Sequence, residues 1–326
     1  MRSSRSLAIT AAAALAVLLL VGCSKTGAGV ASTASGAVTT GPVVAVESFL
    51  ADVTRQVAGG RFEVRAIVPD GVDPHEYAPT PRDAAAVAGA RLIVENGGGL
   101  ESFMTKLIAN AGAGRPVAVA SSGLTSRTAR EGEVLEGGAI ATASSTDPDP
   151  HFWLNPVNVE TYTRNIRDAL IGIDPADRAV YTANADAYIA KLQDLDAWIE
   201  KQVAAIPPTE RMLVTNHESF GYFADRYGFR IIGTVIPSVS SDAAPSARQL
   251  ARLVDGLKAA HARAVFLETG ANPQLADQVA REAGISVVTS LYTHSLSGES
   301  GPAPTYIDMM RYDVTTIVKA LAGSGS

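Results

Sequence analysis

Short apolar segments alternate with amphipathic segments along most of this 326-residue chain, and the alternation occurs twice. Before residue 121 we expect strands at 43–46, 63–68, 92–94 and 117–120, and helices over 47–57, 81–88 and 100–109. After residue 211 we expect strands at 212–215, 231–236, 264–267 and 287–289, and helices over 221–227, 247–260, 273–283 and 306–322. Strands that alternate with helices favour a mostly parallel sheet flanked by helices. The sequence therefore predicts the α/β class, with two lobes of similar construction.

A long segment without glycine separates the two halves. Tyr188, Leu192, Leu195 and Ile199 recur there in steps of three and four, which is the spacing of one helix face. About 30 helical residues extend for about 45 Å. Such a helix could join two lobes as a rigid spine, and the alternative is one long helix packed inside a single domain.

The length of the chain also fits two lobes, because the part after residue 40 exceeds one ordinary domain and suits two of about 120–150 residues each. We expect an N-terminal lobe over 41–173, a linking helix over 174–206 and a C-terminal lobe over 207–326.

The N-terminus has the pattern of an exported lipoprotein. Arg2 and Arg5 precede an apolar run that ends in Val21, Gly22 and Cys23. A charged start followed by a short apolar run is typical of a secretory signal peptide, here residues 1–22. Cys23 is the only cysteine and has no disulfide partner, so we expect it to carry a lipid. The alternatives are a chance cysteine after a cleaved signal and a single transmembrane anchor.

Residues 23–40 are mostly Ser, Thr, Gly and Ala, which predicts a flexible tether between the lipid and the lobes. We therefore expect an extracytoplasmic protein anchored to the cell membrane. The formal net charge is −6, and removal of the two arginines of the signal peptide makes it −8. An acidic protein of this kind offers nothing for nucleic acid to bind and suits a cationic ligand.

Four of the five histidines lie in loop-like segments, three of them directly after an apolar run, and they are His75, His151, His217 and His294. Loops at strand ends can bring such residues together. Neutral imidazole is a good zinc ligand, and four protein ligands describe a closed site that binds a metal without catalysing a reaction. The fifth histidine, His261, stands at the expected end of a helix, where its charge would favour the helix dipole, and we assign it no metal.

The segments around these histidines resemble the metal-binding solute-binding lipoproteins of bacterial ABC transporters for zinc and manganese, the cluster A-I family. The resemblance rests on three motifs, GVDPHEYAPTPRD at 71–83, DPHFWLNP at 149–156 and TNHESFGYF at 215–223. It also includes VENG at 94–97 and YTHSLS at 292–297.

The resemblance implies two α/β lobes joined by a long helix, with one metal held between them by His75 and His151 from one lobe and His217 and residue 294 from the other. The fourth position is commonly a carboxylate in this family, whereas this chain has His294. Nearby carboxylates remain alternatives for the fourth ligand, namely Glu218, Glu268 and Glu299.

A ligand set rich in histidine favours zinc over manganese, because manganese is better served by carboxylates, although copper and nickel also accept imidazole. We therefore expect a monomeric protein that captures zinc, or alternatively manganese, and delivers it to a membrane permease. A zinc metallohydrolase is the main alternative of another class, but the chain has no His-Glu-x-x-His motif, so we expect no enzyme. A surface adhesin is compatible with the lipid anchor but has no residue in its favour. The segment 125–146 receives no role.

Overall fold

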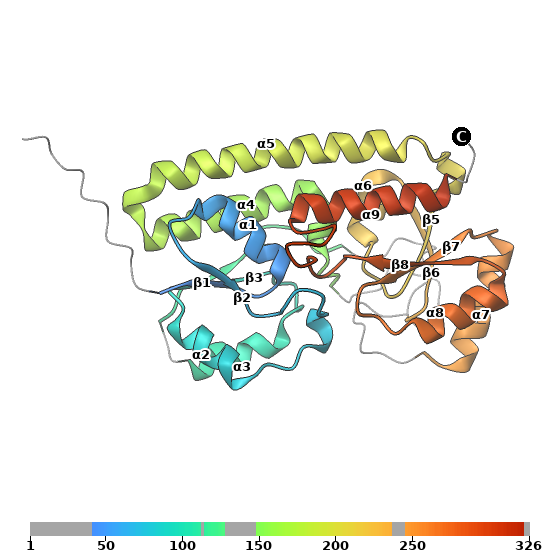
Figure 1. Cartoon of the computed structure of the whole chain (residues 1–326), viewed down its shortest axis with the longest axis horizontal. Coiled ribbons are helices and arrows are strands. Elements are labelled where there is room, and N and C mark those ends of the chain that lie inside the picture. Colours follow the sequence, from blue (N-terminus) through green and yellow to red (C-terminus); the bar gives the residue numbers. More distant parts are fainter. Residues whose placement is uncertain (1–40, 112–113, 128–147, 237–244, 323–326) are drawn as a thin grey trace, which may run out of the picture. The chain divides into compact units, whose positions relative to one another are not determined.

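The structure is a computed structural model that describes residues 41–111, 114–127, 148–236 and 245–322 (Figure 1). Cys23, the signal peptide and the tether lie outside these residues, as does most of the segment 125–146. No helix within the described ranges is both long and apolar enough to cross a membrane.

The first sheet has four parallel strands in the order β2-β1-β3-β4. Its strands are β1 (Val43–Ala45), β2 (Val64–Ala66), β3 (Leu92–Glu95) and β4 (Val117–Val119), and the helices between them are α1 (Ser48–Ala58), α2 (Pro81–Gly89) and α3 (Ser102–Asn110). Side chains alternate between the two faces of a strand. Val44 accordingly packs in one apolar cluster with Met104 of α3, whereas Val43 packs in another with Phe49 of α1. Both faces of the sheet are covered, as Figure 1 shows.

The second sheet repeats this plan in the order β6-β5-β7-β8, again with parallel pairs. Its strands are β5 (Met212–Thr215), β6 (Arg230–Thr234), β7 (Ala264–Glu268) and β8 (Ser286–Leu291), and its helices are α6 (Gly221–Tyr227), α7 (Ala247–Ala259) and α8 (Pro273–Ala283). The register between β7 and β8 shifts between Phe266 and Glu268. Ser290 has a φ of 74° at this irregularity, which pairs Glu268 with Leu291.

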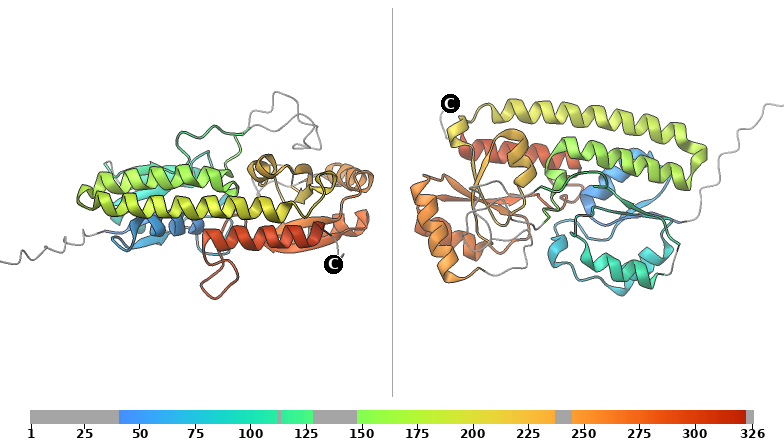
Figure 2. Two further views of the ribbon diagram at one scale, coloured as in Figure 1. Left: turned by 90° about the horizontal axis from the view of Figure 1, so that it is seen from above. Right: turned by 180° about the vertical axis from the view of Figure 1, so that it is seen from behind.

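Three further helices complete the fold, namely α4 (Pro156–Ile173), α5 (Arg178–Val203) and α9 (Tyr306–Leu321). Helix α5 contacts α1 and α4, which pack on the first sheet, and also α6 and α9, which pack on the second. Figures 1 and 2 show α5 alongside α4 and α9. The expectation of two parallel-sheet lobes and one long helix is confirmed. The long helix itself begins at Arg178, after a 3-10 turn over Pro175–Asp177.

Helix α4 was not expected from the sequence, although its start carries a clear signal. The Asn155 side chain accepts a hydrogen bond from the backbone N–H of Val157, and Pro156 occupies the first turn. Both features are typical of helix N-termini. Its buried face includes Val159, Tyr162 and Ile166, and the helix packs against β3 and β4.

A glycine turn after β3 holds the loop that approaches His151. Gly97 has a φ of +86°, and its backbone N–H donates to the Glu101 carboxylate at 3.1 Å. The neighbouring Asn96 donates through Nδ2 to the carbonyl of Pro150 at 3.0 Å. A methyl group on Gly97 would meet Val119 Cγ1 at 2.5 Å.

We predict that Gly97→Ala lowers the free energy of unfolding by about 2–4 kcal/mol, because it combines backbone strain with a clash against β4. Gly99→Ala is the matched control, since Gly99 has a φ of +90° but open space around its Cβ position. The control should lose about 1 kcal/mol from strain alone. Urea unfolding followed by circular dichroism measures both losses, and equal losses would contradict the assignment of a steric clash at Gly97.

Candidate metal centre

The structure brings His75, His151, His217 and His294 together. Each offers one ring nitrogen, and these four atoms all lie within 4.8 Å of one another. His151, His217 and His294 are buried, and His75 is partly exposed. His75 lies between β2 and β3 of the first sheet, His151 follows the last strand of that sheet in sequence, and the other two histidines belong to loops of the second sheet.

Strand ends and short turns deliver these side chains to one place. His75 lies in a 3-10 turn, Pro74–Glu76, after β2, and His151 caps a 3-10 turn, Phe152–Leu154. His217 follows β5 by two residues, and His294 follows β8 by three. Because the carboxyl ends of parallel strands meet at one edge of a sheet, loops from different strands converge there.

The same type of tight turn positions His75 and His151. In both Asp-Pro-His segments the aspartate accepts a hydrogen bond from the backbone N–H of the histidine, Asp73 at 2.8 Å and Asp149 at 2.9 Å. An aspartate that binds the backbone two residues later forms a tight turn, and the intervening proline fixes φ. The sequence shows this repeated pattern, but the role of the two aspartates was not recognised from it.

Two of the distances between the ring nitrogens match those expected around a tetrahedral ion. His151 Nε2 lies 3.2 Å from His75 Nε2 and 3.3 Å from His217 Nε2. Four nitrogens at about 2.0–2.1 Å from a zinc ion at the corners of a tetrahedron are about 3.3–3.4 Å apart. His294 Nε2 is buried and has no hydrogen-bond partner among the described residues. A buried polar atom without a partner is costly, and a cation at the centre would satisfy it.

Carboxylates stand behind three of the rings. His151 Nδ1 lies 2.8 Å from Asp149 Oδ1, His217 Nδ1 lies 3.0 Å from Glu268 Oε1, and His294 Nδ1 lies 3.1 Å from Glu268 Oε2. The contact of His151 Nδ1 with Asp149 has the geometry of a hydrogen bond, whereas His217 Nδ1 has no hydrogen-bond partner among the described residues, and both contacts with Glu268 are ion-pair distances. An ionised carboxylate only accepts hydrogen bonds, so it favours the form of each ring that carries its hydrogen on Nδ1 and its lone pair on Nε2. Carboxylates that contact the other ring nitrogen of a metal-binding histidine hold the ring in the orientation that binding needs.

Burial and mutual proximity keep two of the rings neutral. Burial, followed by the charges of His294 and His217, lowers the pKa of His75 to about 3. The same causes, burial first, hold the pKa of His151 well below its usual value. Neutral imidazole is the form that binds metal, so both rings are ready to bind across the physiological pH range.

The pKa of His294 is shifted in the opposite direction because of Glu268. Burial acts to raise the pKa of Glu268, but His217 and His294 outweigh it and hold that pKa well below its usual value. Burial likewise acts to lower the pKa of His294, yet the charge and hydrogen bond of Glu268 raise it. Glu268 is therefore ionised, and His294 binds a proton more readily than a free histidine does.

Hydrogen bonds link the loops of the two sheets around the histidines. Trp153 Nε1 donates to the carbonyl of Thr293 at 2.7 Å, and Tyr306 Oη donates to the carbonyl of Trp153 at 2.6 Å. The indole ring of Trp153 lies with its centroid 5.2 Å from that of His151 and 5.6 Å from that of His294. The apolar ring excludes water from one side of the cluster.

The other residues singled out in the sequence lie outside the group of converging ligand atoms. Neither Glu218 nor Glu299 belongs to it among the residues that the structure describes, and Glu268 faces the Nδ1 side of two rings. His261 follows α7 in the left-handed region, with a φ of 54°, and is also outside the group.

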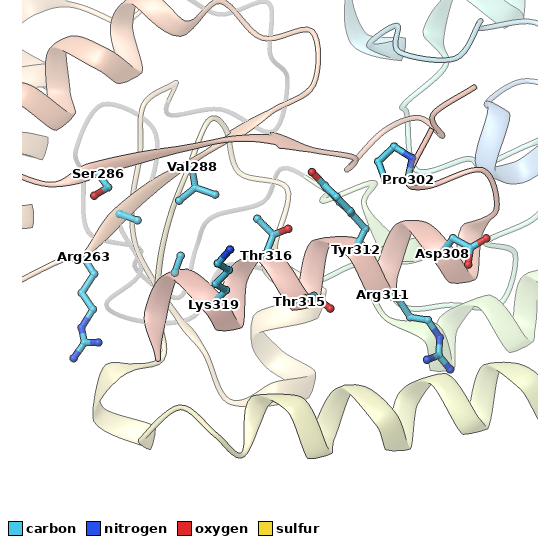
Figure 3. A pocket seen from close by; sticks show the side chains of 12 residues that line it. Arg263, Ser286, Val288, Pro302, Asp308, Arg311, Tyr312, Thr315, Thr316 and Lys319 are labelled. Atoms are coloured by element: carbon cyan, nitrogen blue, oxygen red, sulfur yellow. The ribbon is translucent and has the colours of Figure 1, made fainter. Parts of the chain in front are cut away.

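A separate cavity of 780 Å³ lies between β8 and α9 (Figure 3). Ser286 and Val288 of β8 line one side, and Arg311, Tyr312 and Lys319 of α9 line the other. None of the four histidines lines it. Its volume far exceeds that of one ion, and its cationic side chains do not favour a metal.

Comparison with known proteins agrees with the fold. The family model described as "Zinc-uptake complex component A periplasmic" (ZnuA) matches residues 43–320. The manganese-binding lipoprotein MntA of Halalkalibacterium halodurans is 34% identical over 305 residues, which cover 94% of this chain and 95% of that protein. The iron-binding protein YfeA of Yersinia pestis is 34% identical over 277 residues, or 85% of each chain.

Among solved structures, the manganese-bound periplasmic metal-binding protein from Candidatus Liberibacter asiaticus superposes with a TM-score of 0.75 at 28% identity. The match covers 86% of this chain and 99% of that one. The family model spans nearly all of the described residues. The chain therefore belongs to the ZnuA family and is a metal-binding solute-binding protein of an ABC transporter.

Proposed function

We propose that this chain captures zinc outside the cytoplasm and delivers it to the permease of its transporter. The observation that carries the proposal is the convergence of His75, His151, His217 and His294, with Nε2 atoms 3.2 and 3.3 Å apart where the rings meet. Three of the four rings have a carboxylate behind Nδ1, which keeps Nε2 free for the ion.

The donor set supports zinc over manganese. Four imidazole nitrogens suit zinc, whereas manganese prefers oxygen ligands and lies at the weak end of the affinity order. Membership of the family does not choose the metal, since the relatives compared above are named for manganese and for iron. The choice therefore depends on the ligand atoms of this chain, and His294 in place of a carboxylate is its distinguishing feature.

Four protein ligands also argue against catalysis. A catalytic zinc ion keeps one coordination position open for water. In the proposed site that position is occupied by the fourth imidazole, and both oxygens of Glu268 face ring nitrogens, which leaves this carboxylate no role as a general base. Reversible binding is the function that such a site performs.

The remaining parts of the proposal concern location and assembly. A lipid on Cys23, which lies outside the described residues, would hold the protein at the outer surface of the membrane beside the permease. The tether over 23–40 would let the lobes reach it, and the protein would act as a monomer that receives one ion at a time.

We predict that the protein without its signal peptide binds one zinc ion per chain and gains about 4 kcal/mol of stability when free zinc is about 1,000 times the Kd.

His294→Ala should weaken zinc binding by about tenfold or more, because it removes a ligand. His261→Ala is the control and should bind like the wild type, since His261 lies outside the cluster. Competition with a chromophoric chelator measures the Kd, and wild-type affinity in His294→Ala would assign the fourth ligand to another group.

We predict that His294→Asp keeps a metal site but changes its preference. An oxygen ligand replaces an imidazole nitrogen, so the ratio of zinc affinity to manganese affinity should fall by about tenfold or more. Parallel titrations of both metals into both proteins, with the bound metal verified by elemental analysis, give this ratio. An unchanged ratio would mean that residue 294 does not select the metal.

We predict that zinc affinity falls with falling pH by about one proton per ion. The raised pKa of His294 means that the metal-free site holds a proton that zinc must displace, and this competition grows as the pH falls through that pKa. Burial lowers the pKa of His75 to about 3 and holds the pKa of His151 well below its usual value, so protons compete little with zinc at these two rings. The slope of log Kd against pH between 5 and 8 tests this, and a slope of two or of zero would contradict it.

A further inference from the structure

Glu268 occupies a special place in the second sheet. It is the last residue of β7, and β7 lies between β5 and β8 in the strand order. His217 follows β5 and His294 follows β8, so the central strand ends between the two strands that deliver these histidines. The pairing of Glu268 with Leu291, after the irregularity at Ser290, fixes the position of Glu268 along the strand relative to His294.

Each oxygen of this carboxylate faces a different histidine. Oε1 lies 3.0 Å from His217 Nδ1 and accepts a hydrogen bond from Ser219 Oγ at 3.0 Å, and Oε2 lies 3.1 Å from His294 Nδ1. Glu268 is buried with both rings. The negative charge of one buried group lies beside Nδ1 of two separate rings, which favours a hydrogen on each Nδ1 and a lone pair on each Nε2.

We propose that Glu268 is the positioning residue that couples His217 and His294 into one ligand pair and allows a histidine to act at position 294. The proposal rests on the function proposed above. In this arrangement Glu268 supplies the negative charge from the Nδ1 side of the two rings. A carboxylate ligand would supply the same charge by direct contact with the ion. The pair then binds a divalent cation as two neutral imidazoles with one shared anion.

The charges of the buried cluster support this role. Four neutral imidazoles around a divalent ion leave two positive charges in a site that excludes water, and uncompensated buried charge is expensive. Glu268 and Asp149 each bring one negative charge within 3.1 Å of a ring nitrogen, and the Asp73 carboxylate also acts on His75 and His294, so these carboxylates offset the charge of the ion. His151 has its own carboxylate, whereas His217 and His294 share theirs.

Thr293 offers a different explanation for the orientation of His294, because its Oγ1 lies 2.8 Å from His294 Nδ1. A hydroxyl can accept the same hydrogen, but it carries no charge and can donate as well as accept, so it does not specify the tautomer. It also contacts only one ring of the pair. Replacing Glu268 while keeping Thr293 therefore separates the two explanations.

The test is Glu268→Gln, which keeps the size of the side chain and removes its charge. The amide presents N–H donors to one of the two Nδ1–H groups, so one ring must reverse its tautomer or rotate. We expect zinc affinity to fall by about tenfold to a hundredfold. The control is Glu47→Gln, the same exchange at another buried glutamate, and it should bind zinc like the wild type. Burial, followed by the nearby Glu101 carboxylate, raises the pKa of Glu47 well above its usual value, so this control changes the side chain without removing a buried negative charge.

A double-mutant cycle shows whether the effect passes through His294. An aspartate at position 294 needs no partner behind a ring, so Glu268→Gln should cost less affinity in the His294→Asp background than in the wild type. A purely structural role for Glu268 would cost the same in both backgrounds. Equal losses of affinity in both backgrounds would overturn the proposal, and so would wild-type zinc affinity in Glu268→Gln. Either result would leave zinc capture intact. Absence of zinc binding by the wild-type protein would instead refute the proposed function itself.

Nuclear magnetic resonance of the zinc-loaded wild type gives a readout that does not depend on whether the variant folds. Long-range ¹H–¹⁵N correlations distinguish the two ring nitrogens. We expect His217 and His294 to be protonated at Nδ1 and bound to zinc through Nε2. A ring that binds zinc through Nδ1 would overturn the proposal.

Discussion

The convergence of four imidazole lone pairs is the constraint on which the rest of this structure depends. Nitrogen atoms that all lie within 4.8 Å of one another and are largely removed from water do not stabilise the folded chain without a cation between them. Every loop that carries one of the histidines is held by other interactions instead, such as the aspartate turns at His75 and His151. The protein therefore builds the site from elements that are stable on their own, and the free energy of binding remains available for capture of the ion.

Parallel sheets supply those elements with few residues. In each sheet the strand ends lie at one edge, so short loops from separate strands can place side chains together without long excursions of the chain. Helix α5 packs against helices on both sheets, and the apolar cluster that contains Leu192 and Leu195 also includes Phe49 of α1 and Met309 of α9. Hydrogen bonds from Trp153 and Tyr306 add polar contacts where the loops meet. Precise placement of the histidines follows from rigid packing on both sides of them.

Much of this could be predicted from the sequence, and the failures have a physical cause. The alternation of apolar segments predicted the eight strands, and the loop contexts singled out the four histidines that the structure brings together. Helix α4 was missed, although Asn155 and Pro156 mark its start. The place of Glu268 could not be predicted, because it depends on the order of the strands and on an irregular register next to Ser290. Local sequence contains neither fact, so Glu268 appeared only as one of three alternative carboxylate ligands.

A carboxylate can contact a bound ion directly or can lie behind an imidazole ligand. The choice between these two positions would allow one fold to bind different metals. The ion must be balanced by negative charge in either arrangement, because the site is buried. A carboxylate in contact with the ion offers the oxygen that manganese prefers, whereas a carboxylate behind an imidazole provides the same charge and leaves nitrogen facing the ion. In this chain Asp149 and Glu268 both stand behind histidines. In the proposed site, charge and donor type are therefore separate variables, and an exchange at His294 would change the donor while Glu268 kept the charge.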